Sequence, residues 1–459
     1  MVNRSARTLW LRNIQPTFVV LARLVVGATF VFSGFVKSVD PMGTSLKIRE
    51  YLSAFELDYI MPISLFLAMC IGVYELVLGV NTLFGSYRRV TSILLFLTML
   101  VMTPLTLYLA LADPISDCGC FGEAVYLTHW QSFSKNVVLL LLTVFLLRCN
   151  HRLRGVYHKE IQSLTVYFVV LFAVGMSLYA YYFQPVFDFR PYKLGTNIEE
   201  AISLETFDEP RYVFRNGDVR AEFTVDELPS DTAWHFVERI DAPAPSVHSI
   251  QNFVVYDGED DITEAILSDP NYTFLILSPS LSAAESSVID KIDELYDYTQ
   301  EYGYNLYCLT AVEAGGSEQL APELERRIAE WQDNTGADYP FYSMDASTIQ
   351  TIVRGNPGIV LLHDGVIVQK VRPVHLPEEA ELNAPLDELP FGQPRPYTFR
   401  RPLLTVLVVF FVPMLLLLLT SKTVEAYVVQ ARVRRVARLR KIREAVMEKN
   451  HKNKEENQL

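Results

Sequence analysis

Cysteine is scarce in this chain. Five cysteines stand among 459 residues, and only two of them lie close together. So few cysteines exclude a fold held together by a disulfide framework, and their number alone does not fix a redox compartment. Charge is limited as well, because 20% of the residues are charged while 50% are hydrophobic and the mean hydropathy is +0.18. This composition is too apolar for an ordinary soluble enzyme and too charged for a helical bundle alone, so it predicts membrane and soluble parts in one chain.

Six apolar runs approach the roughly 20 residues that a helix needs to cross a bilayer. They cover residues 18–36, 63–84, 93–111, 137–147, 164–182 and 403–419. The fourth run is the shortest and needs flanking residues to reach full length. The first run lacks the small-residue cleavage pattern of a signal peptide, so we expect it to be retained as a span.

Basic residues in short segments mark the cytoplasmic side of a membrane. Here they gather before the first run, between the second and third, between the fourth and fifth, and after the sixth. These residues include Arg4, Arg7, Arg12, Arg88, Arg89, Arg148, Arg152, Arg154, Lys159, Lys422, Arg432, Arg434 and Arg435. We therefore expect a multi-pass protein of a bacterial inner membrane, with both termini in the cytoplasm and residues 185–401 in the periplasm.

The segment between the fifth and sixth runs is strongly acidic. Residues 185–400 hold 39 Asp and Glu against 14 Lys and Arg, a net charge of −25, in a chain whose total is −13. Such a segment repels nucleic acid, so we expect no nucleic-acid partner. Exported client proteins or subunits of an envelope complex are the partners that we expect.

The two close cysteines lie in the motif DCGCFG at residues 117–122. A disulfide between Cys118 and Cys120 closes a very small ring, whose strained geometry makes the bond easy to open. The same cysteines with His129 and a carboxylate offer ligands for a metal, although the C-x-C spacing is untypical of zinc. A loop lock without chemistry is the third interpretation. We take Cys118 and Cys120 as a candidate redox pair and assign no metal site.

Four polar residues lie within or at the ends of the predicted spans. Arg23 is inside the first span, Lys37 is at its outer end, Glu75 is near the middle of the second, and Asn136 begins the fourth. A charge at this depth costs several kcal/mol unless it is paired or hydrated, so such residues are functional candidates. We expect Arg23 to reach Glu75 on the antiparallel neighbour, either as a lock between helices or in ligand or proton binding.

These pieces resemble the membrane family that includes DoxX and the methylamine-utilisation protein MauE. The similarity covers roughly residues 23–147: an Arg and "SG..K" in the first span, a Glu followed by glycines in the second, then DCGCFG and Asn136. The resemblance implies a four-helix membrane bundle. For some members it also implies quinone-coupled or thiol–disulfide chemistry that supports exported proteins, and quinone is therefore the candidate cofactor.

The acidic segment has two parts of different pattern. "RYVFRNGDVRAEF" predicts a β-hairpin that turns at Asn216 and Gly217. After residue 250, short apolar strands alternate with helical stretches, which is typical of an α/β layer. From about residue 250 to 372 their order resembles a thioredoxin fold of the membrane-tethered TlpA and ResA type.

The thioredoxin resemblance lacks the C-x-x-C motif. Ser282 and Glu285 stand where the two cysteines belong, so this domain alone has no dithiol to exchange. Ser282 and Glu285 match a capping box, in which a Ser and a Glu three residues later close a helix N-terminus. Pro357, preceded by Asn356, falls at the position of the cis proline that presents backbone to an extended peptide. We therefore assign these four residues to partner binding, with a spacer domain as the alternative.

The predicted fold class is an α-helical membrane bundle of six spans, the first four DoxX/MauE-like, plus an exported α/β thioredoxin-like domain. The expected boundaries are 1–160 for the four-helix membrane domain, 161–184 for the fifth helix, 185–249 for a linker with the hairpin, 250–375 for the thioredoxin-like domain, 376–401 for a second linker, 402–420 for the sixth helix and 421–459 for a basic tail. The tail has an apolar stripe beneath basic residues, so it could lie on anionic membrane lipid or dock on a partner.

Two functional hypotheses follow. In the first, the protein is an inner-membrane accessory for thiol–disulfide exchange or maturation of exported proteins, and its exported domain binds the client without catalysis. In the second, it is a structural scaffold of an envelope complex with no redox turnover. A solute carrier that uses Arg23 and Glu75 is disfavoured, because the sequence has no discernible inverted repeats.

Overall fold

The structure is a computed structural model that describes residues 2–112, 114–115, 118–149, 155–183, 185–203, 211–216, 219–223, 234–240, 253–311, 320–394 and 398–456. Within these residues, six helices are long and apolar enough to cross a membrane. They are Thr17–Val39, Asp58–Phe84, Arg88–Ala112, His129–Arg148, Lys159–Tyr182 and Arg400–Glu444. The six predicted spans are confirmed by length and composition, and the fourth extends in both directions beyond its apolar run.

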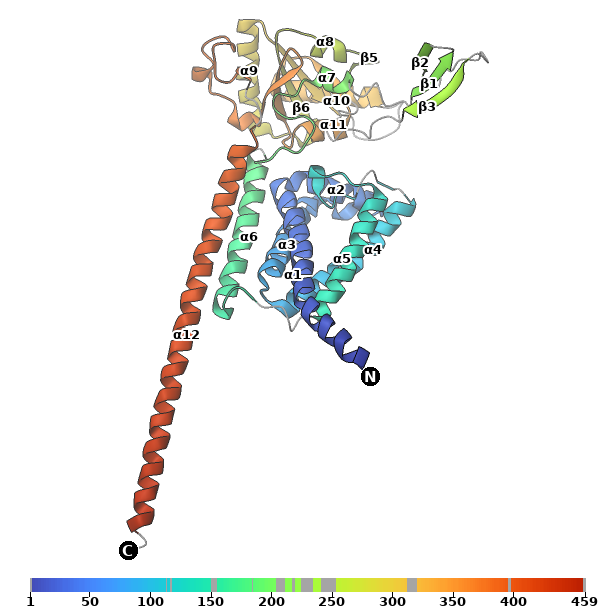
Figure 1. The fold of residues 1–459 in the computed structure, drawn as a ribbon. Coiled ribbons are helices and arrows are strands. Elements are labelled where there is room, and N and C mark those ends of the chain that lie inside the picture. The colour runs from blue at the N-terminus through green and yellow to red at the C-terminus, as the bar shows by residue number, and fades with distance from the viewer. Residues whose placement is uncertain are drawn as a thin grey trace.

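Four of these helices form a bundle. They are α1 (Val2–Val39), α3 (Ser64–Phe84), α4 (Arg88–Ala112) and α5 (His129–Arg148). Helices α1 and α3 approach so closely that a Cβ atom on Gly34 would lie 2.2 Å from the backbone nitrogen of Leu76. The glycines of these two spans therefore serve close helix packing. A short helix, α2 (Pro41–Ala54), crosses the end of the bundle (Figure 1).

Two further helices connect the bundle to the second half of the chain. Helix α6 (Lys159–Tyr182) and helix α12 (Arg400–Glu456) run side by side (Figure 1). The Phe172 and Phe410 rings meet edge to face between them, and Tyr157 before α6 donates to the Met414 carbonyl at 3.1 Å. Helix α12 continues unbroken for 57 residues, about 86 Å at 1.5 Å per residue. Its last part projects beyond the bundle, at the end where α1 begins (Figure 1).

The predicted hairpin is present and gains a third strand. Strands β1 (Arg211–Asn216) and β2 (Val219–Phe223) pair antiparallel, with Asn216 opposite Val219. Strand β3 (His235–Ile240) joins the other edge of β1. The turn residue Gly217 lies outside the described residues. This small sheet stands apart from the main one (Figure 1).

A seven-stranded mixed sheet forms the α/β domain, by which we mean residues 253–394. Its strands are β4 (Val255–Asp257), β5 (Asp260–Asp261), β6 (Tyr272–Ser278), β7 (Asn305–Thr310), β8 (Phe341–Met344), β9 (Gly358–His363) and β10 (Val366–Val371), in the order β10-β9-β6-β7-β8-β4-β5. Strands β6, β7 and β8 are parallel, while β9 is antiparallel to β6 and to β10. The predicted α/β alternation and the final hairpin are therefore present.

Helices cover both faces of this sheet. They are α7 (Ile198–Ser203), α8 (Thr263–Leu267), α9 (Ile289–Tyr302), α10 (Leu320–Thr335) and α11 (Ala346–Ile352). Strand β6 is buried along almost its whole length, so it contributes to a hydrophobic core on each face. The segment after β10 belongs to one of these cores: Leu382 and Leu386 are buried there, and the Tyr298 hydroxyl donates to the Ala384 carbonyl at 2.7 Å.

Candidate functional site

The cysteine pair lies in the loop between α4 and α5, close to α2. The side chains of Cys118 and Cys120 are buried, with 7% and 9% of their surface exposed. Both are free thiols, and their sulfur atoms lie 2.9 Å apart. Gly119 between them has φ +61°, a left-handed conformation that suits glycine. The motif therefore places both sulfurs together, while Asp117 lies outside the described residues.

The first turn of α5 supplies a partner for the pair. Thr128 and Gln131 form a capping box that begins α5, and the fully buried Ser132 follows with its Oγ 3.1 Å from the Cys118 Sγ. Hydrogen bonding from the Cys120 thiol, opposed by burial and aided by Ser132, lowers the pKa of Cys118 to about 5. The same contact with Cys118, together with burial, raises the pKa of Cys120 well above its ordinary value. The geometry thus favours one thiolate and one thiol over two equal thiols.

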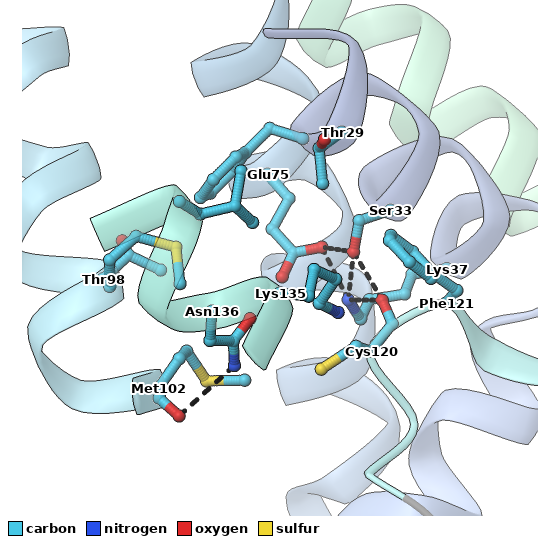
Figure 2. Close-up of a pocket in the computed structure, with 13 residues that line it drawn as sticks. Thr29, Ser33, Lys37, Glu75, Thr98, Met102, Cys120, Phe121, Lys135 and Asn136 are labelled. Atoms are coloured by element: carbon cyan, nitrogen blue, oxygen red, sulfur yellow. Dashed lines mark hydrogen bonds and ion pairs between the residues drawn. The ribbon is translucent and has the colours of Figure 1, made fainter. Parts of the chain in front are cut away.

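An ion pair inside the bundle reaches the cysteine loop from the other side. Lys37 Nζ lies 2.6 Å from Glu75 Oε2 and donates to Ser33 Oγ at 2.7 Å. Ser33 Oγ lies 2.7 Å from Glu75 Oε2. The carbonyl oxygen of Cys120 lies 2.6 Å from Ser33 Oγ and 3.1 Å from Lys37 Nζ. Figure 2 shows these groups converging on the Cys120 backbone, so the charged residues of two spans hold the loop in place.

The predicted pairing of Arg23 with Glu75 is wrong. Arg23 donates to the backbone carbonyls of Thr82 at 3.1 Å and Leu83 at 2.7 Å, which lie at the C-terminal end of α3, beyond Glu75. Helices α1 and α3 run antiparallel, so Glu75 lies level with the second half of α1. Lys37 is 14 residues after Arg23, about 21 Å further along the helix, which explains why Lys37 is the partner of Glu75.

The fourth predicted polar residue, Asn136, joins α5 to α4. Its Nδ2 donates to Thr106 Oγ1 at 3.2 Å and to the Met102 carbonyl at 3.4 Å. Asn136 is buried and lines a cavity of about 40 Å³ together with Lys37, Glu75 and Cys120 (Figure 2). The structure therefore brings Lys37, Glu75, Asn136 and the cysteine loop into one site, and leaves Arg23 outside it.

No metal cluster is found in the part of the chain that the structure describes. Within those residues, no three His, Cys, Asp or Glu side chains stand close enough together to share an ion. Cys308 lies in the buried strand β7, and burial raises the pKa of its thiol.

The predicted capping box in the α/β domain is wrong. Ser282 lies in a 3-10 turn, Leu281–Ala283, and helix α9 begins only at Ile289. A second 3-10 turn intervenes, so Glu285 is not in the first turn of a helix; its backbone N–H donates instead to the Asn356 carbonyl at 3.0 Å. Asn356 also receives a hydrogen bond from Ser278 Oγ at 2.7 Å and donates to the Ser280 carbonyl at 2.8 Å. Asn356 and this loop thus organise one end of the sheet.

The Asn356–Pro357 peptide bond is cis, as the resemblance implies. Asn356 and Ser280 line a cleft of about 820 Å³ between α2 and the α/β domain. Met42 and Arg49 of α2 form the opposite wall. The cleft lies at the ends of β6 and β8, where ligands commonly bind in α/β sheets.

The residues that join the two halves of the chain are absent from the sequence-based predictions. Arg354, just after α11, lies 2.7 Å from Asp40 Oδ2 and 2.7 Å from Glu123 Oε1. Arg372 donates to the carbonyls at the end of α6. An Asp-Pro pair at the start of α2 is a recognisable helix-start signal, but no local pattern marks Arg354 as its partner.

The comparisons with known proteins concern the bundle. No curated protein and no solved structure matches the chain. Residues 15–148, which include α3, α4, α5, most of α1 and the cysteine loop, match the family model described as methylamine utilisation protein MauE. The chain is therefore a multi-pass membrane protein whose first helices form a MauE-like membrane part.

Proposed function

We propose that this protein is a membrane-bound accessory for thiol–disulfide exchange in exported proteins. The observation that carries the proposal is the asymmetric pair of buried thiols, Cys118 and Cys120, 2.9 Å apart in a loop that intramembrane charges hold. A thiolate is the nucleophile in exchange, and Cys118 with its lowered pKa supplies it near neutral pH.

The exchange balances without any further reactant. The Cys118 thiolate attacks one sulfur of a client disulfide, forms a mixed disulfide and releases a client thiolate. Cys120 then loses its proton and attacks Cys118, which closes the Cys118–Cys120 disulfide and releases the second client thiolate. The client disulfide is reduced and the pair is oxidised. The reverse sequence oxidises a client dithiol.

A quinone is the electron acceptor that the family resemblance implies. The cavity beside Cys120 measures about 40 Å³, which is enough for a water-sized molecule and smaller than a quinone ring. The exchange that we propose uses protein disulfides alone, so it requires no quinone at this cavity.

We assign client binding to the α/β domain, on the membrane face opposite to both termini. The basic segments support this orientation, because they flank the spans at the end away from this domain. Parallel β6 and β7 with the crossover helix α9, followed by the antiparallel β9–β10 hairpin, support a thioredoxin-like arrangement. The 820 Å³ cleft between α2 and the sheet is large enough for a segment of a client polypeptide.

Glutathione disulfide tests the chemistry on the full chain in detergent. The reduced wild type should convert its pair to the disulfide, whereas Cys120→Ser should stop as a glutathione adduct on Cys118 that mass spectrometry can detect. Cys118→Ser should form far less adduct. Equal adduct levels in Cys120→Ser and in the double serine variant would refute the proposal, because the remaining cysteines would then account for the reaction.

A scaffold in an envelope complex is the second candidate. It is favoured by Arg354 and Arg372, which join the α/β domain to the membrane part of the chain through contacts that involve no thiol. Under this alternative the double serine variant keeps its stability and its complex, while exchange with glutathione disulfide is absent from the wild type as well.

A further inference from the structure

We infer that Arg354 of the α/β domain is a positioning residue for the cysteine pair. This inference rests on the proposed thiol–disulfide exchange. It assigns to the α/β domain a second role, in which its docking on the bundle sets the geometry of the loop that carries Cys118 and Cys120.

Arg354 makes a buried, multiple contact with two parts of the bundle. Only 5% of its side chain is exposed. Its Nη2 lies 2.7 Å from both Asp40 Oδ2 and Glu123 Oε1, and its Nε lies 3.2 Å from each oxygen of Asp40. Its Nη1 donates to the Gln350 carbonyl at the end of α11. The guanidinium is therefore held by a carbonyl of its own domain and bridges two separate carboxylates of the membrane part. This geometry suits Arg and not Lys.

The first carboxylate, Asp40, begins helix α2. Asp40 is the N-cap of α2, and its Oδ1 accepts from the Gly43 backbone N–H at 2.9 Å. A Cβ on Gly43 would lie 2.8 Å from Arg354 Nη2, so this glycine leaves room for the guanidinium. Further along α2, Lys47 packs on Gly119 and the Tyr51 hydroxyl donates to the Cys118 carbonyl at 3.0 Å. One side of the cysteine loop thus rests on the helix that Arg354 holds.

The second carboxylate belongs to the loop itself. Glu123 lies in the 3-10 turn Gly122–Ala124, three residues after Cys120. Its other oxygen, Oε2, is buried and has no hydrogen-bond partner among the described residues. The contact with Arg354 therefore stabilises this carboxylate, and without it the turn must shift to hydrate Glu123.

The sulfur pair lies between these two attachments. Ser33 and Lys37 of α1 and Ser132 of α5 hold the loop that carries the two sulfurs. Helix α2 holds it as well, and Arg354 joins the start of α2 to the end of the loop. A change in this attachment alters the distance between the sulfurs and the contact with Ser132. By reciprocity, closing the disulfide must alter the strength with which the α/β domain docks.

The test compares two arginines that both join the α/β domain to the membrane helices or the segments next to them. Arg372 donates to the carbonyls of Tyr181 and Tyr182 and pairs with Glu285 at 3.3 Å. Among the described residues, none of these polar contacts reaches α2 or the cysteine loop. Full-length Arg354→Gln and Arg372→Gln variants are equilibrated with mixtures of reduced and oxidised glutathione. We expect Arg354→Gln to change the equilibrium constant for exchange between the Cys118–Cys120 pair and glutathione by about ten-fold, which is within the ordinary range of coupling between sites. Arg372→Gln should leave this constant within about two-fold of the wild-type value.

Two further variants show whether a changed equilibrium constant comes from the lost contact or from misfolding. Glu123→Gln removes one attachment and leaves Asp40 in place, so it should give a smaller change in the same direction. Arg354→Lys keeps the positive charge but lacks the planar guanidinium with its several donors, so its equilibrium constant should lie between those of the wild type and Arg354→Gln. Wild-type constants for Arg354→Gln and Glu123→Gln, or an equal change for Arg372→Gln, would overturn the positioning role. The proposed exchange itself fails separately, if the wild-type pair does not react with glutathione disulfide at all.

Discussion

Ser132→Ala is the sharpest perturbation of the cysteine pair. The hydroxyl of Ser132 is fully buried and lies 3.1 Å from the Cys118 sulfur, so water cannot replace it without rearrangement. A hydrogen bond to a charged group contributes about 1.5–3 kcal/mol, and 1.36 kcal/mol corresponds to one pKa unit. Removing the hydroxyl should therefore raise the pKa of Cys118 from about 5 by about one to two units.

The sign of the pH dependence follows from this value. A lowered pKa keeps Cys118 ionised and reactive at neutral pH, and reactivity is lost as the pH falls through about 5. In the Ser132→Ala variant the loss should occur at higher pH. The ultraviolet absorbance of the thiolate, taken as the difference between each protein and its Cys118→Ser counterpart, measures the midpoint.

A nearby serine provides the matched control. Ser134 lies on the same turn of α5, is exposed, and donates to the Trp130 carbonyl of its own helix at 2.8 Å. Ser134→Ala should leave the midpoint unchanged. A midpoint that is the same in the wild type and in Ser132→Ala would refute the reasoning, because it would mean that the hydroxyl does not stabilise the thiolate.

Three other predictions concern the stability of the bundle and of the α/β domain, and thermal or denaturant unfolding in detergent tests them. Lys37→Met leaves the buried Glu75 carboxylate without its cationic partner and should destabilise the bundle by about 3–5 kcal/mol. A loss below about 1 kcal/mol would contradict the ion pair. Gly34→Ala drives a Cβ into the α3 backbone and should cost about 3 kcal/mol or more, while Gly175→Ala on α6, with nothing within 4 Å, should be neutral or stabilising. Ser282→Ala should change the free energy of unfolding by less than about 0.5 kcal/mol, because Ser282 caps no helix. Asp345→Ala removes the N-cap of α11 and should cost about 1 kcal/mol. Equal losses in the two variants would instead support the predicted capping box at Ser282.

The sequence predicted the elements well because their signals are local. Long apolar runs decide which segments cross a membrane, and the alternation of short strands with helical stretches decides the α/β layer after residue 250. The pair at Asn216 and Gly217 likewise predicts a hairpin, and β1 ends at Asn216. Each of these signals depends on residues that are neighbours in the chain.

The partners of the polar residues could not be predicted in the same way. Arg23 and Glu75 are both ionisable residues in neighbouring spans, and only the register of α1 against α3 shows that Lys37, not Arg23, lies level with Glu75. The motif "SG..K" already places Ser33 one turn before Lys37, so this part of the site had a signal. Arg354 had none, because Asp40 lies 314 positions away in the sequence.

The capping box at Ser282 failed for a different reason. A serine followed three residues later by a glutamate favours a helix start, but this preference amounts to only about 1 kcal/mol. Here the loop forms hydrogen bonds to Asn356 from Ser278 and Glu285 and accepts one at Ser280, and these tertiary contacts outweigh the local preference. The helix therefore starts at Ile289, where no side chain caps it.

Two sets of buried charges in this protein end on the cysteine loop. Lys37 reaches the Cys120 carbonyl from within the bundle, and Arg354 reaches Glu123 from the α/β domain. Burying a charge is costly, and well-packed apolar side chains would hold two domains or two helices together at least as well. Stability alone therefore does not explain why both sets of charges converge on residues 118–124. A requirement to hold two thiols at a defined separation does explain it, because directed hydrogen bonds fix a loop more narrowly than apolar packing does.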